Sequence, residues 1–247
     1  MRGLKQLIFI NIKLYLREPI ATFFTLAFPP LLILLFGTMY GNDPLPLYGG
    51  YGAMDITMPA YSALVLGTVG LLSVPITTGG YREQGILRRY RATPLRPLTY
   101  IIADVLTNLV ITLIGMVVLV AFGWLIYQVQ FEGHVLSVLM AVILGGLSMF
   151  AVGYLIASIV PGARTAQVVG MVIFYPMMFL SGASVPLEVM PETVRRISNF
   201  IPLTYVVSLL RGLWFGNGWG EHLTEVIVLG GVLVVCAGLA ARFFRWE

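Results

Sequence analysis

Six long and nearly uncharged apolar segments limit the folds that are open to this chain. They lie near residues 20–41, 56–80, 101–127, 135–159, 166–185 and 223–241. An α-helix needs about 20 apolar residues to cross the hydrocarbon core of a bilayer, and none of the segments carries a charge near its middle. Only 11% of the residues are charged, whereas soluble domains have roughly 25%. The sequence therefore predicts an all-α membrane protein, a single transmembrane domain over residues 1–247 with six transmembrane helices.

Basic residues are distributed unevenly around these segments. In a six-span arrangement all of the Lys and Arg residues fall on one side except Arg195, Arg196 and Arg211. Cytoplasmic loops are enriched in Lys and Arg, so we expect a multi-pass protein of the plasma (inner) membrane with both termini in the cytoplasm. Because the basic residues flank the spans, they are explained by topology, and nucleic acid is not an expected partner.

The first residues are too polar to form a span. Between residues 1 and 18, polar residues recur at helical spacing opposite apolar ones, which predicts an amphipathic helix lying at the membrane interface. Glu18-Pro19 ends this helix, because proline cannot continue the hydrogen-bond ladder. Lys13 and Arg17 interrupt the apolar run and no small-residue cleavage site follows, so we expect the segment to be retained.

Pro29 and Pro30 lie inside the first predicted span, and Pro75 lies inside the second. Each removes backbone hydrogen bonds and leaves carbonyls that only neighbouring helices or water can satisfy. Both spans are therefore expected to be kinked, and the kinks are open to two interpretations: tolerated irregularities or hinges.

The stretch between the last two predicted spans, residues 185–219, mixes polar and apolar runs that are too short to cross a bilayer. Irregular backbone is not tolerated facing lipid, so this stretch should lie on the outer surface or enter the membrane under cover of other helices. We expect an extracellular re-entrant segment of two short helices that meet at Ile201-Pro202.

The spans lack the groups that ion-coupled transport or catalysis would require. Asp104 is the nearest candidate, and a salt bridge to Arg96 or Arg91 explains it more simply than a functional role. Cys236 is the single cysteine, so neither an intrachain disulfide nor a thiol metal site can form. We expect no catalytic residues and no metal ligands in this chain.

A phosphate-binding loop is not expected either. Gly80 and Gly85 have the spacing of that motif, but Ile86 and Leu87 occupy the positions where Lys and Ser/Thr hold phosphate and magnesium. Any nucleotide hydrolysis would therefore belong to a partner.

The connection over residues 81–98 contains a basic, helix-capable block, REQGILRRYRATPLRP. Apolar residues share one stripe of the predicted cytoplasmic helix, arginines cover the rest, and Pro94 and Pro97 end it. Such a helix can pass force to the spans on either side, because rigid elements that pack together move as units. The alternative is a basic loop that sets topology and touches anionic lipid.

This block resembles the cytoplasmic coupling segment of type-2 ABC (ATP-binding cassette) exporter permeases, and within them the antibiotic and multidrug efflux branch. Arg88 and Arg89 depart from the family pattern, because many members carry an acidic residue there. The resemblance implies ATPase coupling by Arg82, Glu83, Gly85, Leu87, Arg88, Arg91, Thr93 and Pro94. A second, downstream match implies an extracellular gate built from Ser181, Gly182, Pro186, Pro202, Tyr205 and Arg211.

The resemblance implies that this chain is the transport subunit, not an enzyme, of an ATP-driven exporter that moves a hydrophobic or amphipathic drug, antibiotic or metabolite out of the cell. Two copies, as a homodimer, would pair with two cytoplasmic ABC ATPase subunits that hold the ATP and Mg; this chain would hold no cofactor. Family architecture implies a substrate path along Phe28, Thr68, Leu72, Phe174 and Met178. The alternatives are export of a lipid or lipid-linked glycan and, outside the family, a passive channel or a membrane scaffold.

Overall fold

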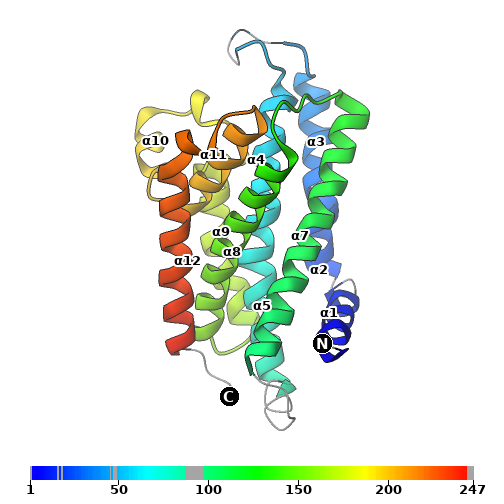
Figure 1. The fold of residues 1–247 in the computed structure, drawn as a ribbon, viewed down its shortest axis with the longest axis vertical. Helices are drawn as coiled ribbons and strands as arrows, with labels where there is room; N and C mark the ends of the chain where they lie inside the picture. Colours follow the sequence, from blue (N-terminus) through cyan, green and yellow to red (C-terminus); the bar gives the residue numbers. More distant parts are fainter. Residues whose placement is uncertain are drawn as a thin grey trace.

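The computed structural model describes residues 2–15, 17, 19–44, 46, 49–86 and 97–243, and the regular elements in these ranges are all helical (Figure 1). The α-helices are α1 (Arg2–Tyr15), α2 (Pro19–Thr22), α3 (Phe28–Tyr40), α4 (Ala53–Thr68), α5 (Val74–Glu83), α7 (Pro97–Tyr127), α8 (Val135–Ile159), α9 (Ala163–Leu180), α10 (Glu192–Ser198), α11 (Pro202–Trp214) and α12 (Leu223–Phe243). Shorter helical turns are η1 (Phe23–Ala27), η3 (Val69–Ser73), η4 (Leu187–Val189) and η5 (Trp219–His222).

Several of these helices have the length and composition of membrane spans. Within the described ranges, five qualify: Ala53–Glu83, Ile101–Tyr127, Val135–Ile159, Ala163–Leu180 and Trp219–Phe243. Where the first of six spans was expected, the apolar helix is shorter, Thr25–Tyr40. The all-helical fold with several membrane-length helices is confirmed, and the sixth crossing stays a prediction.

The continuous run of α4, η3 and α5 forms the centre of the bundle. In its most apolar stretch 89% of the residues are buried, against 11% in the span that contains α12. α4 packs on α3, α7, α8 and α11, while α5 packs on α8 and α9. Glycines permit this close packing: a Cβ at Gly153 of α8 would overlap the Gly70 carbonyl oxygen of η3.

A π-helical turn lies just before each proline site noted in the sequence. η1 precedes Pro29 and Pro30, and η3 precedes Pro75. Proline has no N–H to donate to the carbonyl four residues earlier, so a regular α-helical ladder cannot continue through these positions. The ladder is thus interrupted where kinks were expected, and a hinge role stays a prediction.

The two ends of the bundle carry different elements (Figure 1). The α1 end holds α1, the last turn of α5 and the last turn of α12. The opposite end, here the α11 end, holds α10, α11, the described residues 41–44 and 49–52 before α4, and the connection over residues 128–134. Helices occur where the interface helix and the two short outer helices were expected, and their placement relative to a membrane stays a prediction.

A buried carboxylate organises the α11 end. Asp55, only 2% exposed, accepts hydrogen bonds from the backbone N–H groups of Gly52 and Gln130, both at 2.9 Å. The Asn42 side-chain amide donates a third, at 3.1 Å. Asp55 therefore joins the first turn of α4 to both connections at this end.

Aromatic residues extend this network to α11. The Trp214 indole N–H donates to the Gln130 carbonyl at 2.9 Å, and the Tyr51 ring lies 4.5 Å, centroid to centroid, from that of Phe215. The Tyr51 hydroxyl donates to Glu132 at 2.9 Å, and this hydrogen bond raises the pKa of the phenol. The connections at the α11 end are thus fastened to α11.

Candidate functional site

At the α1 end, the last turn of α5 contacts the connection between α8 and α9. The Arg82 guanidinium donates to the Val160 carbonyl at 2.7 Å. Val160 directly follows α8, where the last carbonyls of a helix have no partner within it and a nearby cation is favourable. The Glu83 side chain lies against Gly162, whose Cβ, if present, would overlap the carboxylate. Arg82 and Glu83 therefore join the predicted coupling segment to α8 and α9.

Gly85 ends this helix by a backbone turn. Its φ of +66° lies in the left-handed region, and its N–H donates to the Arg82 carbonyl at 3.0 Å. Glycine adopts this conformation without the steric cost of a Cβ. The other predicted coupling residues lie outside the described residues; they are Leu87, Arg88, Arg91, Thr93 and Pro94.

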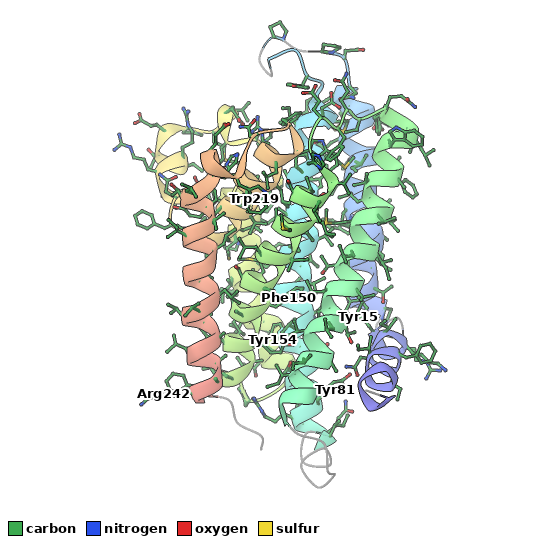
Figure 2. All side chains as sticks on the ribbon, viewed as in Figure 1. Tyr15, Tyr81, Phe150, Tyr154, Trp219 and Arg242 are labelled. Carbon is green, nitrogen blue, oxygen red and sulfur yellow. The ribbon has the colours of Figure 1, made fainter. Side chains whose placement is uncertain are left out.

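Asp104 has hydrogen-bond partners that were not predicted. Its carboxylate accepts from the Tyr154 hydroxyl of α8 at 2.5 Å and from the Asn108 amide at 3.4 Å. The predicted salt bridges of Asp104, to Arg91 or Arg96, lie outside the described residues. Asp104 thus links α7 to α8 near the α1 end, where Figure 2 labels Tyr154.

The Tyr15 hydroxyl forms polar contacts that hold α1 against the bundle. The Tyr15 hydroxyl lies 2.6 Å from the Thr25 hydroxyl and 3.1 Å from the Ser73 hydroxyl. These partners belong to η1 and η3, the two π-helical turns. Any movement of α1 is therefore coupled to the irregular parts of the first two apolar helices.

Four of the six predicted gate residues line one polar cavity at the α11 end. The cavity has a volume of about 510 Å³ and its walls include Ser181, Gly182, Tyr205 and Arg211. The two prolines of the set shape the chain instead. Pro186 precedes η4, and Pro202 is the first residue of α11, where a missing N–H costs no helical hydrogen bond.

Charged groups bridge the elements around this cavity. Arg211 of α11 forms an ion pair with Glu188 of η4. On the other side, Glu225 of α12 accepts a hydrogen bond from the Ser208 hydroxyl at 2.7 Å and lies 3.3 Å from His222 Nδ1. The cavity walls can therefore separate only if these polar contacts break.

Four of the five predicted path residues are buried where α9 meets the central helix: Thr68, Leu72, Phe174 and Met178. Gly67 and Gly170 bring the helices together here, because their hypothetical Cβ atoms would contact Phe174 and Leu72. Phe28 is half-buried at the start of α3, which packs on α4 and α7. A substrate path through these residues stays a prediction.

Comparison with known proteins identifies the family. Residues 2–215 match the model of the family described as ABC-2 type transporter. The chain belongs to this family. Among the relatives of this ABC-2 permease is the probable multidrug ABC transporter permease YbhR of Escherichia coli (strain K12), 24% identical over 158 residues, which are 64% of this chain and 43% of YbhR.

Two further relatives of the ABC-2 permease have related names. The inner membrane transport permease YhhJ of Escherichia coli (strain K12) is 25% identical over 187 residues, 72% of this chain and 50% of YhhJ. The daunorubicin resistance ABC transporter permease protein DrrB1 of Streptomyces coeruleorubidus is 23% identical over 224 residues, 88% of this chain and 77% of DrrB1. The chain spans about half the length of the Escherichia coli relatives it matches.

The family assignment confirms the resemblance read from the sequence and makes this ABC-2 permease a multi-pass membrane protein. Within the described ranges, no group of three or more His, Cys, Asp or Glu residues is placed to hold a metal ion.

Sequence reasoning missed the contact partners Val160, Gly162, Tyr154, Glu188, His222 and Glu225. Two sequence signals could have suggested pairs among them: the charge of Glu188 opposite that of Arg211, and the three-residue spacing of His222 and Glu225.

Proposed function

We propose that this ABC-2 permease is the transmembrane subunit of an ATP-driven exporter of hydrophobic or amphipathic compounds. Two copies would pair with two cytoplasmic ABC ATPase subunits, in the plasma membrane and with both termini inside. ATP and Mg would bind to the ATPase subunits. The observation that carries the proposal is the contact of Arg82 and Glu83 with the α8–α9 connection.

This contact provides a route from the coupling segment into the bundle. A displacement of the last turn of α5 would also move the Val160–Gly162 connection, because packed rigid elements shift together. α5 continues through η3 into α4, and α4 packs on α11 at the other end. Force applied at the α1 end would thus reach the cavity between Arg211 and Glu225.

The proposed cargo class rests on the predicted path and on the names of relatives. Phe174, Met178 and Leu72 offer an apolar surface that can re-pack around molecules of different shape, with Thr68 as a hydroxyl among them. The names of two relatives include multidrug and daunorubicin resistance. Export of a hydrophobic drug or metabolite is the function that these features support best.

Copurification and a coupling variant test the proposal. We expect the tagged chain to retain an ATPase subunit in mild detergent, and reconstituted vesicles to move a hydrophobic drug only with ATP. The double variant Glu83→Ala with Gly85→Pro should abolish this transport, because it removes the contact with Gly162 and forbids the positive φ at Gly85.

The matched control is Glu221→Ala with Gly218→Pro at the α11 end. Gly218 has φ −80° and nothing near its hypothetical Cβ, so proline fits there, and we expect transport to be retained. Unchanged transport by a well-folded coupling variant would show that the coupling assignment is wrong. Absence of both an ATPase partner and ATP-dependent transport would overturn the exporter proposal as a whole.

A further inference from the structure

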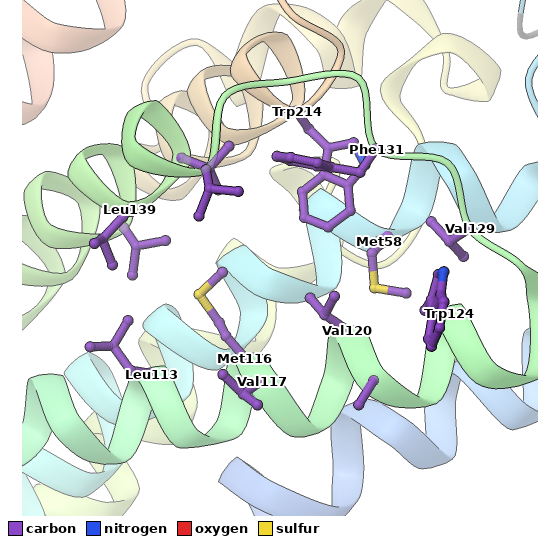
Figure 3. Close-up of a pocket in the computed structure, with 14 residues that line it drawn as sticks. Met58, Leu113, Met116, Val117, Val120, Trp124, Val129, Phe131, Leu139 and Trp214 are labelled. Atoms are coloured by element: carbon purple, nitrogen blue, oxygen red, sulfur yellow. The ribbon is translucent and has the colours of Figure 1, made fainter.

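A second cavity lies between α7 and α8, in the half of the bundle toward the α11 end (Figure 3). It has a volume of about 500 Å³. Met116 and Val120 of α7 form one wall, Leu139 of α8 forms the other, and Met58 of α4 lines the end near Phe131. Although α7 and α8 are consecutive, α7 packs mainly on α1 and α4, and α8 packs mainly on α12 and η3. The cavity occupies the space that they leave.

The lining of this cavity is apolar. Its side chains are aliphatic, methionine or aromatic, and one of the two indole N–H groups, that of Trp214, already donates to the Gln130 carbonyl. Pockets for drug-like molecules carry a few placed polar groups that orient the ligand. A cavity of this kind stays free of water and favours a hydrocarbon ligand over an amphipathic one.

The cavity opens sideways, through side chains that face the surroundings of the bundle. Val117 is 67% exposed, Trp124 is 60% exposed and Val135 is 71% exposed. These residues belong to two membrane-length helices, so lipid hydrocarbon is the medium that meets the opening. Trp124 lies near the end of α7, at the depth where indole rings favour a membrane interface.

We propose that this cavity binds one acyl chain of a membrane phospholipid. The chain would fill the space between Val120 and Leu139 and contact Met58, with its head group beside the connection over residues 128–134. Trp214 lines the cavity and also belongs to α11. The bound lipid would therefore contact α11, the helix whose Arg211 lines the polar gate cavity.

Photo-crosslinking in membranes tests this site without requiring transport. The protein is reconstituted in phosphatidylethanolamine and phosphatidylglycerol vesicles that contain a phosphatidylcholine with a diazirine on one acyl chain. We expect crosslinks to concentrate on the cavity walls in α7 and α8. Leu139→Trp should lower this labelling by about tenfold or more, because excluding even a few buried methylenes costs that factor in affinity.

Neighbouring positions outside the cavity supply the controls. Met140→Trp on α8 and Leu125→Trp on α7 place the same ring on exposed positions that do not line the cavity, and labelling should be unchanged. Ala121→Trp fills the cavity from α7 and repeats the test if Leu139→Trp does not fold. Equal labelling of filled and control variants would overturn the proposal.

A competition arm separates lipid from cargo. Excess unlabelled phospholipid should remove the label, whereas excess of an amphipathic drug should leave it within about twofold, because the cavity lacks groups that orient an amphipathic molecule. Displacement by the drug as strongly as by phospholipid would assign the cavity to cargo and overturn the lipid proposal.

Discussion

At the scale of single residues, a few polar side chains hold the elements together by contacts that span long stretches of sequence. Arg82 satisfies a carbonyl at the end of α8, and Asp55 gathers donors from two connections. Buried polar groups cost free energy when their partners are removed, so these residues should matter more than their exposed counterparts.

Arg82→Ala should destabilise the protein by about 1.5–3 kcal/mol, the range for hydrogen bonds to charged groups, because the carbonyl after α8 loses its charged donor. Thermal unfolding in detergent measures this change. Arg195→Ala on the exposed face of α10 is the matched control, and its effect should stay within about 0.5 kcal/mol. Equal melting temperatures for the two variants would contradict the structural role of Arg82.

Asp55→Ala should cost roughly 3 kcal/mol or more, because it leaves the donors of Gly52, Gln130 and Asn42 without their acceptor. Thermal unfolding again reports the loss, and protease cleavage should increase in the connections at the α11 end. Asp43→Ala, an exposed carboxylate nearby, serves as the control and should change little. A mild effect of Asp55→Ala would show that the network does not hold this end.

At the scale of elements, close approach of backbones decides how the central helix packs. The hypothetical Cβ of Gly153 would overlap the Gly70 carbonyl oxygen, and that of Gly170 would overlap the Leu71 carbonyl oxygen. In a regular α-helix the Leu71 carbonyl would accept from residue 75, but Pro75 has no N–H to donate. The π-helical turn η3 contains Leu71, and α9 packs against the same carbonyl through Gly170. Irregular backbone is thus packed against small residues.

Gly153→Ala should destabilise the bundle by about 1–3 kcal/mol, the usual cost of overpacking, because the obstructing atom is backbone and cannot rotate away. Gly231→Ala on α12 is the matched control, since nothing lies within 4 Å of its hypothetical Cβ. The control should be neutral or stabilising by up to about 1 kcal/mol through helix propensity. The two melting temperatures should therefore move in opposite directions or differ clearly.

At the scale of the whole molecule, α1 and the last turn of α12 lie at the same end of the bundle, and α10 and α11 lie at the other (Figure 1). Because the first and last helices begin and end on the same side, the chain between them would cross a membrane an even number of times. Five described helices have full span length, so the shorter helix Thr25–Tyr40 would have to supply the sixth crossing.

Labelling of single cysteines in a Cys236→Ser background tests this arrangement. Lys13→Cys and Arg242→Cys should react with a membrane-impermeant maleimide only in inverted vesicles. Phe200→Cys, at a site 89% exposed at the α11 end, should react in intact cells. Reaction of positions 13 and 242 from opposite sides would exclude six crossings.

The sequence by itself determined the helical membrane fold, most span positions and the family, because these depend on local properties. Apolar length predicts a span wherever it lies. Pro19 begins a helix and Gly85 ends one, each through its own backbone chemistry. The motif around Arg82 and Glu83 is equally local. These features needed no knowledge of which helices are neighbours.

Only the tertiary structure decided which polar residues contact one another. Arg82 contacts Val160, Asp104 contacts Tyr154 and Arg211 contacts Glu188, because elements distant in sequence pack with particular positions along their axes side by side. These axial positions depend on where small residues allow two backbones to come into contact, as at Gly70 and Gly153. A hydropathy pattern does not encode them. The cavity between α7 and α8 has the same origin: it is the space left when each helix packs best on other partners.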